Sequence, residues 1–224
     1  MIESCAASLV YSDHGREVFA CRAISIDVRD GEFLGILGPS GSGKSSLLYL
    51  LSGLKQPSSG CIRYRGQDLA SLSDEERSNM RLREFGFVFQ QAFLLGYLSA
   101  LENVLAANPT NGNIATLQNP NTVTPDSAAA LLATLGLGEK LHRRPHELSG
   151  GERQRVCVAR ALFGSPNAIF ADEPTASLDH KNGEAVVRLL NQHRGKGSLI
   201  MVTHDETMLD EADRIVRLVD GQIV

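Results

Sequence analysis

The sequence has no run of apolar residues long enough to cross a membrane. Its 224 residues are 42% hydrophobic and 21% charged, and polar residues interrupt every stretch before the ~18 uncharged residues that a membrane helix requires. The opening segment, MIESCAASLVYSDHGREV, lacks the basic start and unbroken apolar run of a secretory signal. We therefore expect a mature, cytoplasmic N-terminus and a chain that does not itself span a bilayer.

Cysteines are few and widely spaced along the sequence. The four residues are Cys5, Cys21, Cys61 and Cys157. They form no C-x-x-C pair, which argues against a zinc site and against a redox motif. Buried, reduced thiols are the simpler expectation for all four.

Positive charge is also scarce. The net charge is −4 and the pI is near 5.9, and the basic clusters at Arg81 with Arg83 and at Arg143 with Arg144 are small. A nucleic-acid-binding surface usually combines a high pI with a basic stripe. We therefore expect no nucleic-acid partner.

Short apolar runs predict strands towards both ends of the chain. Apolar and polar residues alternate from 24 to 28, as in antiparallel strands with one solvated face. Continuous apolar runs indicate strands buried on both faces, at 33–38, 168–171 and 198–203. Helical patterns follow at 45–54 and 183–193, which is the α/β alternation typical of a parallel sheet.

A helical region interrupts this alternation. Ser73 and Glu76 have the S-x-x-E spacing of a capping box, so a helix should run from there towards Arg83. Residues 85–90 then have the pattern of a strand, and the chain from 92 to 163 has helical patterns. We expect an inserted helical lobe.

One segment of this lobe has no apolar period. Residues 108–126 are rich in Asn, Thr, Pro and Gly, which predicts an exposed loop. The segment ends in Thr124, Pro125 and Asp126, where the threonine can cap a helix that has proline at its first position. We expect a helix to begin there.

The segment GPSGSGKSS contains the G-x-x-x-x-G-K-[ST] pattern of a phosphate-binding loop. Its glycines let backbone N–H groups turn around a phosphate, and the start of the next helix adds partial positive charge. Lys44 can reach the β- and γ-phosphates, and the Ser45 hydroxyl can ligate Mg²⁺. The predicted nucleotide-binding residues here are Gly38, Pro39, Ser40, Gly41, Ser42, Gly43, Lys44, Ser45 and Ser46.

Two adjacent carboxylates end the apolar run at 168–171. Asp172 and Glu173 can be merely the polar end of a buried strand, but ligands of parallel α/β sheets bind outside the carboxyl ends of the strands. Neighbouring strand residues point in different directions. We therefore predict that Asp172 holds the metal and that Glu173 is the general base.

Two further polar residues follow predicted strands. His204 comes directly after the run at 198–203 and is predicted to contact the γ-phosphate, although a lone histidine is more often structural. Gln90 follows the run at 85–89, and its amide can reach Mg²⁺ or water. For Gln90, the capped end of a strand is the alternative.

The segment LSGGERQRV raises a separate question. Ser149 and Glu152 have capping-box spacing, so the segment can simply begin a helix. Gly150 and Gly151 then lie just inside that helix, where each glycine costs up to ~1 kcal/mol relative to alanine. Bare backbone and a serine hydroxyl at a helix N-terminus also form a ready anion site.

Taken together, the motifs resemble one family. GPSGSGKSS, FVFQQ, LSGGE, IFADEP, SLD and VTHD occur in this order, as in the ATPase subunits of ABC transporters, and the resemblance covers essentially the whole chain. It implies an α/β P-loop NTPase fold with a mixed RecA-like core sheet, an N-terminal antiparallel β subdomain and an inserted α-helical subdomain. The core would comprise residues 1–91 and 164–224, and the helical subdomain residues 92–163.

The resemblance also assigns roles to residues. It implies that Lys44, Glu173 and His204 are catalytic and that Ser45, Gln90 and Asp172 hold Mg²⁺. Further ATP-binding residues are Tyr11 for the adenine, Asp179, and Ser149, Gly150, Gly151 and Glu152 for the γ-phosphate of ATP bound to the other subunit. Phe19 is an alternative to Tyr11 as the stacking aromatic.

The partners follow from the same resemblance. It implies ATP and Mg²⁺ as cofactors, a second copy of the chain, and an integral membrane permease on a separate chain. The subunit would be cytoplasmic and attached to the inner face of the cell membrane through that permease. The departure of residues 108–126 from the family pattern leaves the choice of permease and cargo open.

The functional alternatives differ in what the ATPase drives. The segments YRGQDLASLSDEERSNMR, FGFVFQQ and LSALENV resemble the macrolide-export and lipoprotein-release subgroup, which implies export of a hydrophobic or amphipathic cargo. The alternative is an ATPase that transmits force to envelope or cell-division machinery without transport. A soluble translation or DNA-repair ATPase should have tandem ATPase units or a long heptad insertion, and the sequence has neither.

Overall fold

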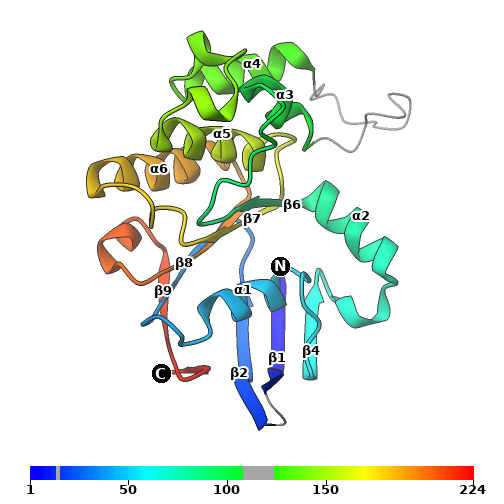
Figure 1. Cartoon of the computed structure of the whole chain (residues 1–224). Helices are drawn as coiled ribbons and strands as arrows, with labels where there is room; N and C mark the ends of the chain where they lie inside the picture. The colour runs from blue at the N-terminus through cyan, green and yellow to red at the C-terminus, as the bar shows by residue number, and fades with distance from the viewer. Residues whose placement is uncertain (14–15, 108–123) are drawn as a thin grey trace.

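The computed structural model describes residues 1–13, 16–107 and 124–224, and in these residues it contains two β-sheets and the helices that cover them (Figure 1). The predicted loop at 108–126 lies outside the described residues except for its last three positions. No helix in the described part of the chain has the length and apolar character needed to cross a bilayer.

The first sheet is antiparallel, as the alternating pattern predicts. Its strand order is β2-β1-β4-β5, with bounds β1 Ile2–Asp13, β2 Arg16–Val28, β4 Ser59–Tyr64 and β5 Gln67–Asp68. Ile24, Ile26 and Val28 are buried and the residues between them are exposed. One face of this sheet therefore packs on the core and the other faces solvent.

The second sheet is the central one, with strand order β10-β9-β3-β8-β7-β6. The bounds are β3 Phe33–Leu37, β6 Phe85–Val88, β7 Ala168–Asp172, β8 Ser198–Thr203, β9 Arg214–Val219 and β10 Gln222–Ile223. Its strands pair in parallel except for the antiparallel pairing of β9 with β10. Every residue of β3, β7 and β8 is buried, as the continuous apolar runs predict.

The bounds of the helices are α1 Lys44–Leu51, α2 Asp74–Glu84, α3 Ala100–Leu105, α4 Pro125–Thr134, α5 Gly150–Leu162 and α6 His180–His193. Helices α2, α4 and α5 begin at the capping residues that the sequence predicts. Ser73 caps α2 in a complete capping box with Glu76, and Thr124 caps α4 with Pro125 at its first position. These local signals are strong because each satisfies a backbone N–H that the helix leaves free.

Three predicted boundaries were wrong. The helix predicted at 45–54 ends at Leu51. The helix predicted at 183–193 begins at His180, because the carboxylate of Asp179 accepts a hydrogen bond from the backbone N–H of Asn182 (3.1 Å) and caps α6. The strand predicted at 85–90 ends at Val88. Gln90 therefore lies in the segment after β6 and not on the strand itself.

Each central strand supplies two hydrophobic cores. Phe33, Ile169 and Leu199 pack towards α3, α4, α5 and α6, whereas their neighbours Leu34 and Phe170 pack with α1 and the antiparallel sheet. The alternation follows from the period of two in a strand. Figure 1 accordingly shows the helical layer and the antiparallel sheet on opposite sides of the central sheet. The predicted helical lobe thus shares a core with the sheet.

The prediction that all four thiols are buried is confirmed for two of them. Cys21 and Cys157 are buried, but Cys5 and Cys61 are half-buried. β1 and β4 are neighbouring strands, and their register places Cys5 and Cys61 directly opposite each other. The sequence did not reveal this pairing, because the two cysteines are far apart along the chain. All four cysteines carry free thiols.

The packing of Phe170 yields a stability prediction. Its fully buried ring lies 5.0 Å from that of Phe85 and 5.6 Å from that of Phe87, between centroids. Phe170→Ala should lower the free energy of unfolding by about 3–5 kcal/mol, because it leaves a cavity in the core. Urea denaturation followed by circular dichroism measures this change. Phe93→Ala is the control, since Phe93 is 63% exposed; equal losses in the two variants would contradict this packing.

Candidate functional site

The phosphate-binding loop lies at the edge of the central sheet where its parallel strands end. The loop follows β3, and the registers pair Leu37 with Thr203 and Asp172 with Val202. The residues after β3, β7 and β8 are therefore brought to one place. This edge is where parallel α/β sheets bind ligands.

Two glycines of the loop are required by close packing. At Gly43, φ is +96° and a Cβ would lie 2.0 Å from the carbonyl oxygen of Ala20. At Gly38 a Cβ would lie 2.3 Å from the carbonyl oxygen of Leu218. The loop is thus held between β2 and β9. Gly43 caps α1 with no side-chain hydrogen bond, so the helix start keeps backbone N–H groups free for an anion.

Lys44 is folded into the loop. Its side chain is 6% exposed, and its Nζ donates hydrogen bonds to the carbonyl oxygens of Gly38 (2.8 Å) and Pro39 (3.0 Å). The ammonium lies 3.6 Å from Oε1 of Glu173. Close by, the buried hydroxyl of Ser42 has no hydrogen-bond partner among the described residues. An orphaned donor and a buried cation in one loop suit a phosphate ligand.

Asp172 is held by two residues of α1. Ser45 Oγ donates to Asp172 Oδ1 (2.7 Å), and the Tyr49 hydroxyl donates to Oδ2 (2.8 Å). Burial, together with the hydrogen bond to Asp172, raises the pKa of Tyr49 to about 12, so the phenol remains a donor at neutral pH. The sequence prediction missed Tyr49. Its spacing of four residues from Ser45, on one face of a helix, was the available signal.

Glu173 faces different partners from Asp172. Its Oε2 lies 2.9 Å from Nδ1 of His204, and its Oε1 faces Lys44. The backbone of Glu173 has φ +45°, an uncommon conformation for a residue with a side chain, and its N–H donates to the carbonyl of Val202 (3.0 Å). The turn directs the second carboxylate away from the first, and such strain concentrates at functional sites.

The donor set at this edge fits a magnesium ion. The Ser45 hydroxyl and the Asp172 carboxylate are adjacent oxygen ligands, which Mg²⁺ prefers, and Mg²⁺ usually binds through one or two protein ligands and substrate phosphates. Gln90 is exposed beyond the end of β6, the strand beside β7. Among the described residues, no hydrogen bond joins Gln90 to Ser45 or Asp172, so its role at the metal stays a prediction.

Helix α5 holds the segment that carries Gln90. Gln154 Nε2 donates to the carbonyl of Phe89 (3.3 Å), and Arg160 donates to the carbonyl of Ala92 (3.0 Å). These two side chains fix the backbone on both sides of Gln90. The sequence did not reveal this contact, because it joins residues about 65 positions apart.

Helix α5 begins at the LSGG segment. Ser149 Oγ accepts a hydrogen bond from the N–H of Glu152 (3.3 Å), and the Glu152 carboxylate accepts one from the N–H of Ser149 (2.8 Å). The bond to the Ser149 backbone lowers the pKa of Glu152. The predicted capping box is therefore present. The carboxylate that completes it stays ionised at neutral pH.

Among the residues that the structure describes, none crowds the two glycines after Ser149. A Cβ on Gly150 would meet no atom closer than 4.0 Å, and one on Gly151 none closer than 3.8 Å. This contrasts with the crowded Gly38 and Gly43. Helix α5 and the loop helix α1 also belong to cores on opposite faces of the central sheet (Figure 1). Contacts among residues 1–13, 16–107 and 124–224 therefore give no steric reason for glycine at these two positions.

Asp179 lies beside this helix start. It caps α6, and its hydrogen bonds to Asn182 lower its pKa. A Cβ on Gly151 would come within 4.0 Å of the Asn182 side-chain oxygen. The first turns of α5 and α6 are thus close together.

The two candidate stacking aromatics lie on neighbouring strands. Tyr11 on β1 is 40% exposed, and Phe19 on β2 is 38% exposed with the Arg22 guanidinium 4.5 Å from its ring centroid. Phe19 directly precedes Ala20, which packs on Gly43. The structure leaves both aromatics available for an adenine, and the assignment to Tyr11 stays a prediction.

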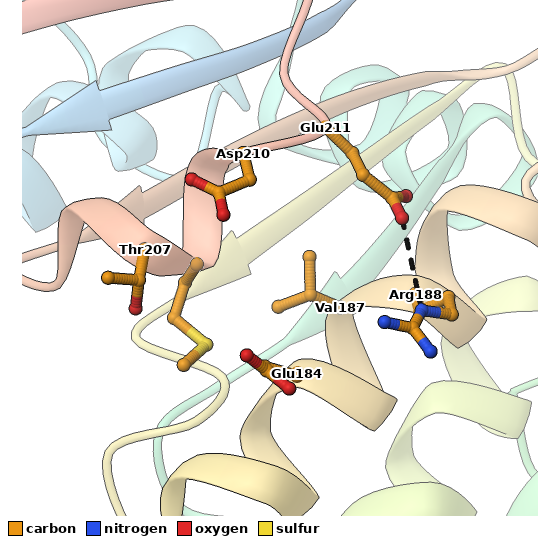
Figure 2. Close-up of a pocket in the computed structure, with 7 residues that line it drawn as sticks. Glu184, Val187, Arg188, Thr207, Asp210 and Glu211 are labelled. Carbon is orange, nitrogen blue, oxygen red and sulfur yellow. Dashed lines mark ion pairs between the residues drawn. The ribbon is translucent and has the colours of Figure 1, made fainter.

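A small hollow of about 70 Å³ lies apart from these residues, between α6 and the 3₁₀ turn at Glu206–Leu209 (Figure 2). Arg188 and Glu211 form an ion pair across its rim (3.9 Å). A drug-sized ligand occupies about 300 Å³ or more. This hollow is therefore too small for a nucleotide, and none of the predicted site residues lines it.

Comparison with known proteins reveals the family. Residues 21–176 match the family model described as ABC transporter. An uncharacterised ABC transporter ATP-binding protein of Methanocaldococcus jannaschii is 40% identical over all of this chain and 98% of its own length. The lipoprotein-releasing system ATP-binding protein LolD of Aquifex aeolicus is 42% identical over 91% of this chain and 88% of its own length.

Longer relatives match over part of their length. The macrolide export ATP-binding/permease protein MacB of Syntrophobacter fumaroxidans is 43% identical over 92% of this chain, which spans 29% of that protein. The ATP-binding cassette MJ0796, solved as a dimer in a post-hydrolysis state with ADP and phosphate, superposes with a TM-score of 0.86 at 33% identity, covering 100% of this chain and 96% of that one. The chain therefore belongs to the ABC transporter family, as an ATP-binding ATPase subunit.

Proposed function

We propose that the chain binds ATP with Mg²⁺ at the loop edge of the central sheet and that its hydrolysis powers a membrane permease. The observation that carries the proposal is the position of Glu173 between Lys44 (3.6 Å) and the His204 ring (2.9 Å). A base, a cation and a hydrogen-bonding ring beside a phosphate loop are the parts that phosphoryl transfer to water requires.

The proposed roles follow from these contacts. The ammonium of Lys44 exchanges its two carbonyl acceptors in the loop for oxygens of the terminal phosphates and offsets their charge. Glu173 takes a proton from the attacking water on its carboxylate, and His204 holds that carboxylate in place and contacts the γ-phosphate. Ser45 and Asp172, with Gln90, hold Mg²⁺, which when bound neutralises charge on the β- and γ-phosphates.

We further propose that two copies share each ATP. The N-terminus of α5, with Ser149 and Gly150 exposed and Gly151 and Glu152 half-buried, would be an anion site on the opposite side of the sheet from α1. A second copy placed head-to-tail supplies the phosphate that this site lacks within its own chain. The dimeric state of the cassette MJ0796 supports this arrangement. Asp179 lies beside the same helix start and would face the partner copy.

We place the permease contact at a groove of about 380 Å³ between α2, β6 and α5. Leu82, Phe87 and Phe89 line it, and the ring of Phe89 contacts the 63% exposed Phe93. Arg81 and Arg160 also line this groove, so it suits an amphipathic helix of a partner protein. Because Phe89 directly precedes Gln90, a helix seated there contacts the segment that leads into the ATP site.

The relatives support an exporter. MacB proteins carry an ATP-binding part and a permease in one polypeptide, and this chain corresponds to about a third of their length. LolD, in contrast, is named for lipoprotein release and matches over most of its length. We propose that the cargo is hydrophobic or amphipathic and that the permease holds the chain at the inner face of the cell membrane.

Glu173→Gln should abolish turnover and preserve ATP binding. The amide keeps the size of the side chain but cannot accept the proton, so phosphate release should fall by at least ~100-fold. Because ATP is then not consumed, gel filtration with MgATP should show a stable dimer. Glu184→Gln, at the separate hollow, should leave the rate unchanged. Wild-type turnover by Glu173→Gln would rule out the base assignment.

Ser149→Arg should block ATP-dependent dimerisation while each monomer still binds ATP. The bulky cation fills the anion site at the start of α5. Ser73→Arg is the matched control, because Ser73 caps α2 in the same way and its loss costs the same ~1 kcal/mol of helix stability. Gel filtration in the Glu173→Gln background, with a fluorescent ATP analogue for binding, distinguishes the two. A full dimer from Ser149→Arg would contradict the shared site.

A further inference from the structure

Two cysteines face each other on neighbouring strands of the antiparallel sheet. Cys5 on β1 and Cys61 on β4 are directly opposite residues of two antiparallel neighbours. The adjacent Ser4 and Ile62 are buried against the core, so both cysteines lie on the outer face of the sheet. Each is half-buried, whereas Cys21 and Cys157 are buried.

The separation of the two residues suits a covalent link. Directly opposite Cα atoms in an antiparallel pair lie about 4.5–5.5 Å apart, and disulfides span about 4.4–6.8 Å between Cα atoms. The Cβ atoms, at about 4.5–5.5 Å, must approach slightly. The ladder is irregular directly beside the pair, with a register shift after Cys5 and positive φ angles at Ala6 (+47°) and Gly60 (+79°).

The neighbouring Cys5 side chain, together with partial burial, raises the pKa of the Cys61 thiol, while Arg63 lowers it and Asp68 raises it. The thiolate is the attacking species, and a raised pKa leaves less of it at neutral pH, so oxidation should become faster as the pH increases.

We propose that Cys5 and Cys61 form a redox modification site that is oxidised to an intramolecular disulfide by low-molecular-weight disulfides. One thiolate attacks a sulfur of the small disulfide, forming a mixed disulfide and releasing one small thiolate. The second cysteine, as its thiolate, then attacks the protein sulfur and releases the other. The two cysteines are oxidised and the small disulfide is reduced. The two protons that leave the protein thiols protonate the two released thiolates.

The disulfide would covalently close a stretch of the chain that contains the phosphate loop. Residues 5–61 contain β2, β3, the loop and all of α1. Cross-linking the ends of this segment restricts the unfolded chain, which favours the folded state. Because the strands must adjust, the bond should be labile and easily reduced, as strained and exposed disulfides are.

The test treats the folded, full chain with oxidised glutathione and then counts free thiols in denaturant, with peptide mass mapping. We expect two of four thiols to be lost, one Cys5–Cys61 cross-link within a single chain, unmodified Cys21 and Cys157, and a faster reaction at pH 9 than at pH 7. The melting temperature should rise by several degrees and return to its original value with dithiothreitol.

Cys5→Ser and Cys61→Ser are the matched variants. Each should stop at a stable mixed disulfide on the remaining half-buried cysteine, with no gain in melting temperature. The proposal is overturned if the wild-type chain accumulates glutathione on both cysteines, cross-links between chains, or loses these thiols no faster than Cys21 and Cys157. Neither result bears on ATP hydrolysis, which the Glu173 and Ser149 variants test separately.

Discussion

The parallel pairing of β3 with β8 and of β8 with β7 is the constraint on which the site depends. It brings the ends of three strands together, so the loop after Leu37, the carboxylates of Asp172 and Glu173, and His204 converge although they are far apart in sequence. Ser45 and Tyr49 of α1 then hold the Asp172 carboxylate in place through hydrogen bonds. A one-residue slip in either register would invert the side chains at this edge.

The alternation of side chains along the central strands explains why the phosphate loop and the proposed anion site at the LSGG segment lie apart. Strands β3, β6, β7 and β8 each send one set of side chains to α1 and the antiparallel sheet and the other set to α3–α6. The loop helix α1 and the LSGG helix α5 therefore lie on opposite faces, and a phosphate bound at one start is not presented to the other start of the same chain. The proposed pair of copies would bring the two together.

Local chemistry was readable from the sequence, whereas contacts between distant segments were not. The loop glycines, the carboxylates after a buried run and the capping boxes at Ser73 and Ser149 each act within a few residues, so pattern and spacing predicted them. Three contacts depend instead on tertiary packing and strand register. They are the hydrogen bond of Tyr49 to Asp172, the hydrogen bond of Arg160 to the segment around Gln90, and the pairing of Cys5 with Cys61. The early start of α6 came from an overlooked cap, and the stacking role of Tyr11 stays a prediction.

The most direct test of the central claim, that each ATP site is divided between two copies, is complementation between two inactive variants. Lys44→Ala removes the loop cation and Ser149→Arg blocks the LSGG site, so neither variant alone can assemble a complete site. A mixed dimer contains one complete site, from the loop of one copy and the LSGG segment of the other. ATP hydrolysis should therefore reappear when the two purified variants are mixed. A mixture that hydrolyses no more ATP than the sum of the separate variants would contradict the account.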